Sequence, residues 1–298
     1  MERLYVFFCN AGIKAIQNEP LAQHSTFRIG GAAKLALFPA SLDQMLTCLQ
    51  KLTEYGVRYA VIGKGSNVVF SDDGFDGVIV FSGEWNEILI EGERLTVSAG
   101  VTLASLAAQA QRLGLSGLEF AHGIPGTVGG AVFMNAGAFG GSIADVCEST
   151  TYFEPETGKI QTVRGPEHAF GYRSSFYAKY PQYTVLSATF RLKGDDGEAI
   201  LARMNDYAAR RRSTQPLEYP SAGSVFKRPE GYFAGKLIED CGLKGARIGG
   251  AEVSEKHAGF IVNRGGATSL QVRALVELIR ARVYVRCGVR LECEIRFL

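Results

Sequence analysis

The sequence carries almost no net charge, because 32 Lys and Arg residues offset 30 Asp and Glu residues in a chain of 298. A formal charge of +2 supplies no overall field that would hold a nucleic-acid backbone. The basic cluster Arg210–Arg212 has no interleaved aromatic residues, and cations suit a helix C-terminus, so we expect a solvated helix end there. Nucleic acid is not an expected partner.

The sequence also lacks paired cysteines and long apolar runs. Its six cysteines are scattered without a C-x-x-C pair, which predicts neither a zinc site nor a disulfide framework and favours reduced, buried thiols. The apolar run Leu4–Phe8 is too short to span a membrane, and no convincing cleavage site follows it. We therefore expect a cytoplasmic protein with no bound metal and no membrane partner.

Neither glycine-rich loop of the sequence has the spacing of a common nucleotide-binding motif. GKGSN at residues 63–67 does not complete the Walker A pattern, and the longer segment at residues 123–141 lacks the G-x-G-x-x-G of a Rossmann turn. These absences disfavour a kinase and an ordinary nicotinamide dehydrogenase.

What is present is typical of a globular chain, with 46% hydrophobic and 21% charged residues and enough length for two or three domains. Ser41 is placed to cap a helix that ends at Gly56, and apolar runs at residues 59–62 and 77–81 predict buried strands. This strand–helix–strand order predicts a small α/β unit over residues 1–81.

The remainder of the chain mixes helices with antiparallel strands, which predicts an α+β fold with further units at residues 82–196 and 197–298. The expected helices are residues 103–113, 198–212, 234–241 and 269–285. The expected strands are residues 88–90, 95–99, 150–153, 184–192, 249–253, 258–263 and a cleanly alternating final strand, LECEIRFL, at 291–298.

The segment at residues 123–141 holds seven glycines among nineteen residues, with apolar Val132, Phe133 and Met134 between them. A flexible linker would be polar, so this backbone is expected to bend within a core. Glycine lets backbone N–H groups approach a ligand closely and form a concave anion site. From the residues alone two interpretations stay open: a phosphate-bearing cofactor held by both glycine loops, or tight turns at domain corners.

The order of several separate motifs resembles the UDP-N-acetylenolpyruvoylglucosamine reductases, flavoenzymes of bacterial cell-wall synthesis. The resemblance runs from about residue 19 to the C-terminus. The motifs are STFRIGG at 25–31, GKGSN at 63–67, LEFAHGIPGTVGGAVFMNAGAFGG at 118–141, YRSSF at 172–176, PSAGSVFKRP at 220–229, AGKLIEDCGLKG at 234–245 and LECEIRF at 291–297. Two features depart from the family: His122 stands where a small residue is usual, and the first eighteen residues match nothing.

The resemblance implies a two-part FAD-binding domain of the vanillyl-alcohol-oxidase (PCMH) type, followed by a C-terminal α+β substrate-binding domain. The chain is similar to the short type, which lacks an inserted substrate loop. FAD would lie in the two glycine loops. The residues carried over as cofactor-binding are Gly63, Lys64, Gly65, Ser66, Asn67, Gly123, Ile124, Pro125, Gly126, Thr127, Gly129, Gly130, Asn135 and Gly137.

The implied reaction reduces the enolpyruvyl ether of UDP-N-acetylglucosamine enolpyruvate to UDP-N-acetylmuramate, a peptidoglycan precursor. NADPH is the hydride donor, and hydride reaches the substrate from N5 of FAD. The family pattern assigns Ser224 as proton donor, Arg173 as the guanidinium that polarises the substrate carboxylate, and Glu294 as a carboxyl beside the substrate, with a raised pKa or a bridging cation. The residues carried over for the UDP diphosphate are Lys227, Arg228, Lys256 and His257.

Two other functions were weighed against this one. The first is a generic FAD-linked oxidase on the same scaffold, and the second is a non-catalytic nucleotide-sugar sensor. The pairing of SAGSVF with a terminal LExEIR argues against the oxidase. The presence of Arg173, Ser224 and Glu294 together argues against the sensor, since a sensor needs no proton donor.

Overall fold

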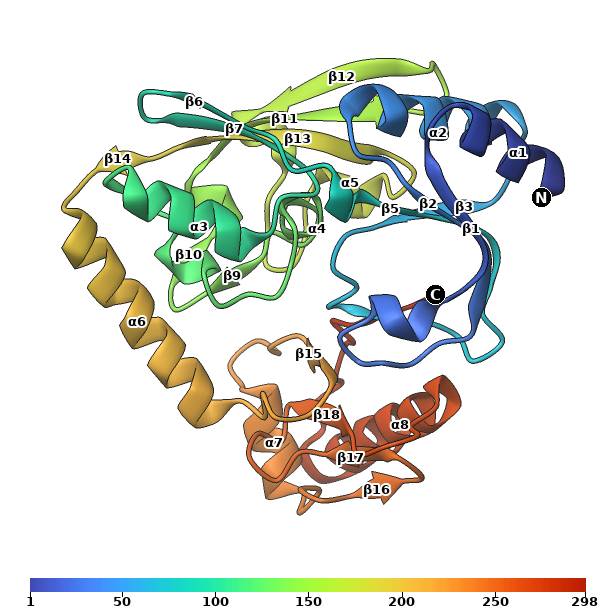
Figure 1. Cartoon of the computed structure of the whole chain (residues 1–298). Helices are drawn as coiled ribbons and strands as arrows, with labels where there is room; N and C mark the ends of the chain where they lie inside the picture. Colours follow the sequence, from blue (N-terminus) through green and yellow to red (C-terminus); the bar gives the residue numbers. More distant parts are fainter. The chain divides into compact units, whose positions relative to one another are not determined.

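The computed structural model describes all 298 residues, and its backbone groups into two compact units (Figure 1). Unit 1 comprises Met1–Gln17, Lys34–Lys64 and Gly77–Arg210, and unit 2 comprises Asn18–Ala33, Gly65–Asp76 and Arg211–Leu298. Two short N-terminal segments therefore group with the C-terminal part of the chain. The division into residues 1–81, 82–196 and 197–298 stays a prediction.

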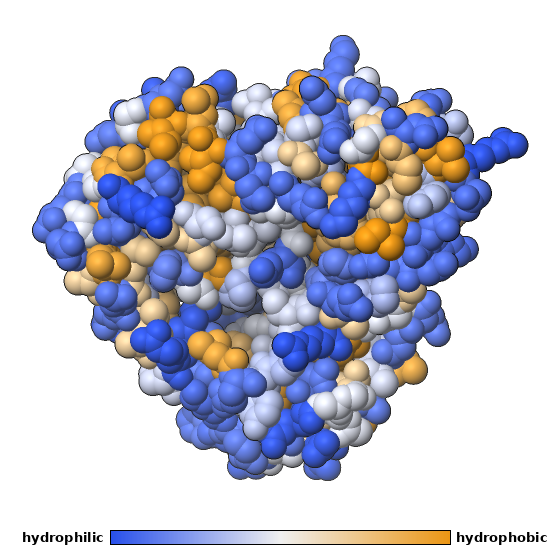
Figure 2. Space-filling model, in the orientation of Figure 1, coloured by the Kyte–Doolittle hydropathy of each residue, from blue (hydrophilic) through white to orange (hydrophobic).

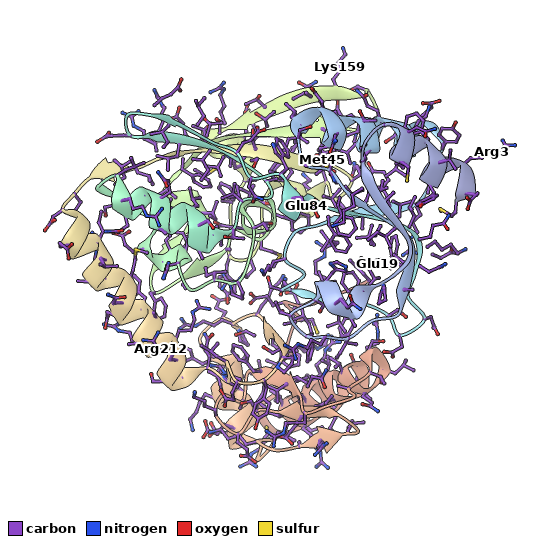
Figure 3. The ribbon with its side chains drawn as sticks, viewed as in Figure 1. Arg3, Glu19, Met45, Glu84, Lys159 and Arg212 are labelled. Carbon is purple, nitrogen blue, oxygen red and sulfur yellow. The ribbon has the colours of Figure 1, made fainter.

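The first part of the chain forms a four-stranded sheet in the order β1–β2–β5–β3, in which β3 and β5 run parallel. Leu4 and Phe8 of the first helix and Met45 of the second join the buried core of this region, and Met45 lies beneath its helix (Figure 3). The elements are α1 (Glu2–Asn10), β1 (Lys14–Pro20), β2 (Ala32–Phe38), α2 (Leu42–Glu54), β3 (Tyr59–Ile62) and β5 (Phe75–Phe81).

The larger part of unit 1 is built on a five-stranded antiparallel sheet in the order β12–β11–β13–β7–β6. Helices α3 and α4 lie on the same face of this sheet (Figure 1), and α4 packs against β13 and β7. The elements are β6 (Ile88–Glu91), β7 (Arg94–Ser98), α3 (Leu103–Arg112), β8 (Leu115–Ser116), α4 (Val128–Met134), β9 (Gly137–Ala138), β10 (Gly141–Ser142), β11 (Cys147–Glu154), β12 (Lys159–Arg164), α5 (Phe176–Lys179), β13 (Thr184–Arg191) and β14 (Lys193–Gly194).

Unit 2 is a second α+β body with its own core. Its four-stranded sheet has the order β15–β18–β17–β16, and α8 packs against α7, β16 and β17. The elements are β4 (Val68–Val69), β15 (Ser221–Ser224), α7 (Ala234–Asp240), β16 (Arg247–Ile248), β17 (Ala251–Val253), β18 (Phe260–Asn263), α8 (Ser269–Cys287) and β19 (Arg296–Phe297). The helix α6 (Gly197–Thr214) begins in unit 1, and only its last residues, from Arg211, belong to unit 2.

The local signals that predicted helices are confirmed by the caps of those helices. The hydroxyl of Ser41 accepts the N–H of Gln44 at the start of α2, and Gly56, just after its end, has φ +60°. Gly114 has φ +65° after α3. Glycine adopts this left-handed conformation without a Cβ clash, which is why it ends helices.

The predicted final strand at residues 291–298 is wrong over most of its length, since only Arg296–Phe297 forms a strand. The alternation itself holds, because Leu291 and Ile295 are buried whereas Glu292 is exposed. The segment divides its backbone hydrogen bonds between two different neighbours: Glu294 N–H bonds the Val225 carbonyl, and Arg296 N–H bonds the Asn67 carbonyl. Because the partner changes along the segment, no continuous ladder forms.

The surface is polar with local apolar exposure. Hydrophobic side chains gather over the part of unit 1 that contains β6 (Figure 2), where Leu89 and Ile90 are exposed. Lys159 of β12 points away from the molecule (Figure 3).

None of the helices combines the length and the apolar content that crossing a membrane requires. All six cysteines are free, but only Cys48 and Cys147 are buried, so the expectation of buried thiols holds for those two alone.

Candidate active site

The first half of the long glycine loop is fastened to the turn that precedes α3. The N–H of Leu103 bonds the Gly126 carbonyl, and the N–H groups of Val128 and Gly129 bond the carbonyls of Val101 and Ala99, each at 2.9 Å. The loop that leads into α4 is therefore a fixed part of the core of unit 1, as the apolar residues between its glycines predict.

Several glycines of this region are required by close packing. A Cβ at Gly63 would lie 2.1 Å from Oγ1 of Thr127, and a Cβ at Gly129 would lie 2.9 Å from that of Ala99. Real Cβ atoms do not approach other atoms so closely, so a side chain at Gly63 would push the two glycine loops apart, and one at Gly129 would push the long loop away from Ala99. At Gly130, by contrast, the nearest atom to an added Cβ is 3.8 Å away, which leaves space on that side of α4.

Thr127 stands at the N-cap of α4 with a hydroxyl that has no partner in the protein. The residue is only 3% exposed, its side chain makes no capping hydrogen bond, and its Oγ1 is buried without a hydrogen-bond partner. An unsatisfied buried hydroxyl costs about 1–3 kcal/mol. The N–H groups of Val128 and Gly129 in the first turn of α4 already bond the carbonyls of Val101 and Ala99, whereas the Thr127 hydroxyl remains for a ligand. The donor set at this point therefore fits an anionic group such as the pyrophosphate of FAD.

The second glycine loop, GKGSN, bridges the two units in sequence: Gly63 and Lys64 belong to unit 1, and residues 65–67 belong to unit 2. Within unit 2, Gly65 has φ +62°, and a Cβ there would lie 2.1 Å from the carbonyl oxygen of His24. The amide of Asn67 donates to the Glu294 carbonyl at 3.1 Å. Asn67 therefore links this loop to the segment that carries a predicted catalytic residue.

The second half of the long loop returns along β9 and β10. A Cβ at Gly137 would lie 2.6 Å from the Gly141 carbonyl oxygen, so this hairpin also requires glycine. Asn135, at the C-cap of α4, takes the left-handed conformation and bonds the Gly171 carbonyl through its amide at 2.9 Å. The loop thus reaches the turn that carries Arg173.

Arg173 occupies a strained position in a tight turn. Gly171 and Ser174 exchange backbone hydrogen bonds of 3.0 and 3.2 Å around it, and Arg173 itself has φ +52°. Its Nη2 donates to the Gly137 carbonyl at 3.2 Å, and its guanidinium carbon lies 5.2 Å from the ring centroid of Tyr172. A non-glycine residue in this conformation costs on the order of 1–3 kcal/mol and marks functional turns.

Ser224 and Glu294 lie on paired segments of unit 2. Ser224 ends β15 opposite Phe260, at an irregularity in the pairing, and is half-buried. The next residue, Val225, accepts the N–H of Glu294 at 2.8 Å. The structure therefore brings the backbones of the predicted proton donor and the predicted carboxyl side by side. Arg173, the third predicted catalytic residue, belongs to unit 1 and not to unit 2.

The four residues predicted for the diphosphate all lie in unit 2, and each has partners in the protein. Lys227 pairs with Glu292 at 2.5 Å, and Arg228 stacks over the Phe233 ring at 3.9 Å. Lys256 donates to the carbonyl of Arg212, which lies at the C-terminal end of α6 (Figure 3), at 2.7 Å.

His257, the fourth of these residues, lies in a more buried environment. Its Nδ1 accepts the N–H of Gly259 at 3.1 Å, and burial lowers the pKa of its imidazole. A neutral imidazole offers a diphosphate a hydrogen bond and no charge. A role for His257 in substrate binding therefore stays a prediction.

Sequence reasoning missed Glu119, which anchors the segment that enters the long loop. Burial alone would raise the pKa of this carboxyl, but hydrogen bonds from Arg203, the Gly117 N–H and the Ser116 hydroxyl hold it below its ordinary value. Arg203 of α6 reaches Glu119 at 2.8 Å. The signal was an acidic residue in the otherwise apolar LEFA, directly before the glycines.

A buried polar network joins β11 to two residues, His168 and Tyr177, that flank the Arg173 turn in sequence. Nε2 of His168 is hydrogen-bonded to the Thr150 hydroxyl at 3.0 Å, and the Thr150 hydroxyl is also hydrogen-bonded to the Tyr177 hydroxyl at 2.5 Å. Burial lowers the pKa of His168, and its other ring nitrogen lies 2.9 Å from the Gly165 carbonyl oxygen. When the His168 ring is neutral, one arrangement of protons satisfies every hydrogen bond of this network. The Tyr177 hydroxyl donates to Thr150, the Thr150 hydroxyl donates to Nε2 of His168, and Nδ1–H of His168 donates to the Gly165 carbonyl.

Comparison with known proteins first defines the class. Residues 33–164 match the family described as FAD binding domain, and this range contains both glycine loops. The match places the chain in the class of FAD-binding proteins, and the buried, unpartnered hydroxyl at the N-terminus of α4 lies within the matched range. Both the fold class and the FAD cofactor expected from the sequence are confirmed.

The particular family follows from relatives that cover almost the whole chain. Residues 215–298 match the UDP-N-acetylenolpyruvoylglucosamine reductase C-terminal domain. The reductase of that name from Caldicellulosiruptor bescii is 45% identical over 98% of this chain and 93% of its own, and the one from Clostridium botulinum is 43% identical over 94% and 91%. The crystal structure of the reductase from Thermus caldophilus has a TM-score of 0.80 at 35% identity, covering 96% of this chain and 98% of that one. The chain belongs to the UDP-N-acetylenolpyruvoylglucosamine reductase family.

Proposed function

We propose that the protein uses NADPH to reduce the enolpyruvyl ether of UDP-N-acetylglucosamine enolpyruvate to UDP-N-acetylmuramate, in the cytoplasm, for peptidoglycan precursor synthesis. The observation that carries the proposal is the fastening of Arg173 to the loop that follows α4, through Gly137 and Asn135. This arrangement links a cationic residue that suits a carboxylate to the loop that fits FAD. Bound FAD supplies the hydride chemistry, from NADPH to the substrate double bond.

The glycine loops hold the cofactor in this proposal. The Thr127 hydroxyl would donate a hydrogen bond to the pyrophosphate, and the open side of α4 at Gly130 would let that group approach the backbone. The cofactor-binding assignments of residues 63–67 and 123–130 rest on the same two loops. Gly63, whose Cβ would meet Thr127, keeps the loops close enough for both to contact one ligand.

The protein's own groups manage charge and the proton. Hydride addition to the terminal carbon places negative charge on the adjacent carbon and its carboxylate. Arg173 stabilises that charge through its planar donors, which match a carboxylate. The hydroxyl of Ser224 then gives its proton to the adjacent carbon, which completes the addition of H⁻ and H⁺ across the double bond.

Two further assignments complete the substrate site. Glu294 lies beside Ser224 by backbone pairing, where its carboxyl orients the proton donor. Lys227, Arg228, Lys256 and His257 lie in the C-terminal domain and face the UDP diphosphate in this proposal. Lys227 would then exchange its bond to Glu292 for a phosphate, since that acidic side chain is 73% exposed and is easily released to water.

Anaerobic half-reactions test the proposal. NADPH should bleach the flavin absorbance of the purified protein, and the enolpyruvyl UDP-sugar should restore it without oxygen. A flavin that is reoxidised by oxygen alone, with rapid oxygen consumption, would show an oxidase instead. A protein that binds the UDP-sugar but is never bleached by NADPH would be a sensor.

A further inference from the structure

Asn135 lies at a junction of three chain segments. It ends α4 with φ 42° and ψ 58°, and it is only 8% exposed. Asn tolerates the left-handed conformation better than other non-glycine residues, so the backbone shape alone favours it. That preference does not explain why the side chain is buried.

The side-chain amide of Asn135 is engaged by the protein at both ends. Its Nδ2 donates to the Gly171 carbonyl at 2.9 Å, and its Oδ1 accepts the N–H of Ala144 at 2.9 Å. These bonds join α4, the 3-10 turn Ile143–Asp145 and the turn that carries Arg173. These two bonds use one of the two N–H donors and one of the two oxygen lone pairs of the amide, and they fix its orientation within the protein.

Two other bonds hold the Arg173 turn to the same loop. The hydroxyl of Ser175 donates to the Phe133 carbonyl at 2.8 Å, and Nη2 of Arg173 donates to the Gly137 carbonyl at 3.2 Å. The bond from Asn135 lies between them and acts on Gly171, at the start of the turn. Arg173 in its left-handed conformation persists only because the surroundings fix it.

We propose that Asn135 is a positioning residue that holds the Arg173 turn against the glycine loop, and that it acts on the substrate half-reaction through Arg173 instead of holding FAD. The inference rests on the proposed function, because it assigns Arg173 to the substrate carboxylate. It replaces the cofactor-binding role that the sequence resemblance gave to Asn135. A misplaced guanidinium weakens the transition state, since catalysis depends on groups held in position.

Two substitutions at this position separate the bonds. Asn135→Asp keeps the size, the left-handed preference and the acceptor for Ala144, but it cannot donate to Gly171. Asn135→Gly keeps the backbone conformation and removes both bonds. Both variants should bind FAD with unchanged affinity and be reduced by NADPH at the wild-type rate. Reoxidation of the flavin by the enolpyruvyl UDP-sugar should slow at least tenfold in both.

A double-mutant comparison tests whether the effect passes through Arg173. Arg173→Gln removes the charge, and adding Asn135→Asp to it should slow reoxidation by less than twofold more. Ser175→Ala, which removes the neighbouring tie, should slow the same half-reaction in the same direction. Ser98→Ala is the matched control, since the buried Ser98 hydroxyl also bonds two backbone groups in unit 1 but lies in the β7 strand away from the turn. It should leave both half-reactions unchanged.

Any of three positive results would overturn the inference, and so would wild-type behaviour of the Asn135 variants. The three results are loss of FAD affinity in Asn135→Asp, equal slowing of both half-reactions, and multiplicative effects of Asn135→Asp and Arg173→Gln. If the wild-type flavin is reoxidised by the sugar nucleotide while the Asn135 variants behave like wild type, the inference fails and the proposed function stands. If the wild-type flavin is not reoxidised at all, the proposed function fails first.

Discussion

Thr127→Val removes a hydroxyl that the folded protein buries without a partner, and it keeps the volume and β-branching of the side chain. Replacing an N-cap threonine usually costs about 1 kcal/mol, but Thr127 makes no capping bond, so that cost does not apply here. In the FAD-free protein the substitution relieves part of the roughly 1–3 kcal/mol penalty of an unsatisfied hydroxyl. The free energy of unfolding without FAD should therefore stay level or rise.

The same substitution should weaken FAD binding. A hydrogen bond to a charged acceptor contributes about 1.5–3 kcal/mol, and each 1.4 kcal/mol is about tenfold in affinity. The dissociation constant for FAD should rise roughly 10- to 100-fold. Titration of the apoprotein with FAD, followed by flavin fluorescence, measures the affinity, and urea unfolding of the apoprotein measures stability.

The affinity for FAD must fall while the free energy of unfolding of the apoprotein stays level or rises. A variant that is less stable without FAD by more than about 1 kcal/mol, yet binds FAD with wild-type affinity, would show that the hydroxyl has a structural partner. The assignment of the N-terminus of α4 to the pyrophosphate would then be refuted.

Three further predictions follow from the same structure. Gly63→Ala should lower stability by about 1–3 kcal/mol and lower the FAD content, because the new Cβ would lie 2.1 Å from Thr127 Oγ1. Gly83→Ala is the control, since a Cβ there meets nothing within 4 Å, and it should match wild type in thermal unfolding and flavin absorbance. Ser224→Ala should leave flavin reduction by NADPH intact and slow reoxidation by the substrate about 10²- to 10⁴-fold; equal rates in stopped flow would exclude Ser224 as the proton donor. Because burial lowers the pKa of His168 in the folded state, its contribution to stability is present above its unfolded value of about 6.5 and is lost as the pH falls through the folded value. The fall in melting temperature between about pH 7 and 5 should therefore be smaller in His168→Gln, and an unchanged slope would contradict that assignment.

Short-range signals predicted the parts of the fold that depend on neighbouring residues. Ser41 and Gly56 mark the two ends of α2 because a cap and a left-handed glycine act within one turn of the chain. The glycines of residues 123–141 predicted a loop bent within a core, and the packing of Gly129 against Ala99 agrees with the bend. The helix α4, which occupies Val128–Met134 of this segment, was not predicted.

The sequence did not predict which segments pair when they are far apart in the chain. The alternation of residues 291–298 correctly predicted the buried face, but it gave no indication that the backbone partner changes between Val225 and Asn67. Asn135 and Gly171 lie 36 residues apart, so nothing local marks their hydrogen bond. The catalytic assignments of Arg173, Ser224 and Glu294 came from a family resemblance, because no local pattern in the sequence distinguishes a catalytic arginine, serine or glutamate from a structural one.

The central claim is that the glycine loops hold FAD for the reduction of a sugar-nucleotide enol ether. The most direct measurement is stopped-flow absorbance of the NADPH-reduced protein mixed anaerobically with UDP-N-acetylglucosamine enolpyruvate. The oxidised flavin spectrum should return, and one UDP-N-acetylmuramate should form for each flavin. A spectrum that stays bleached, in a preparation that holds a full complement of FAD, would show that the protein does not reduce this enol ether.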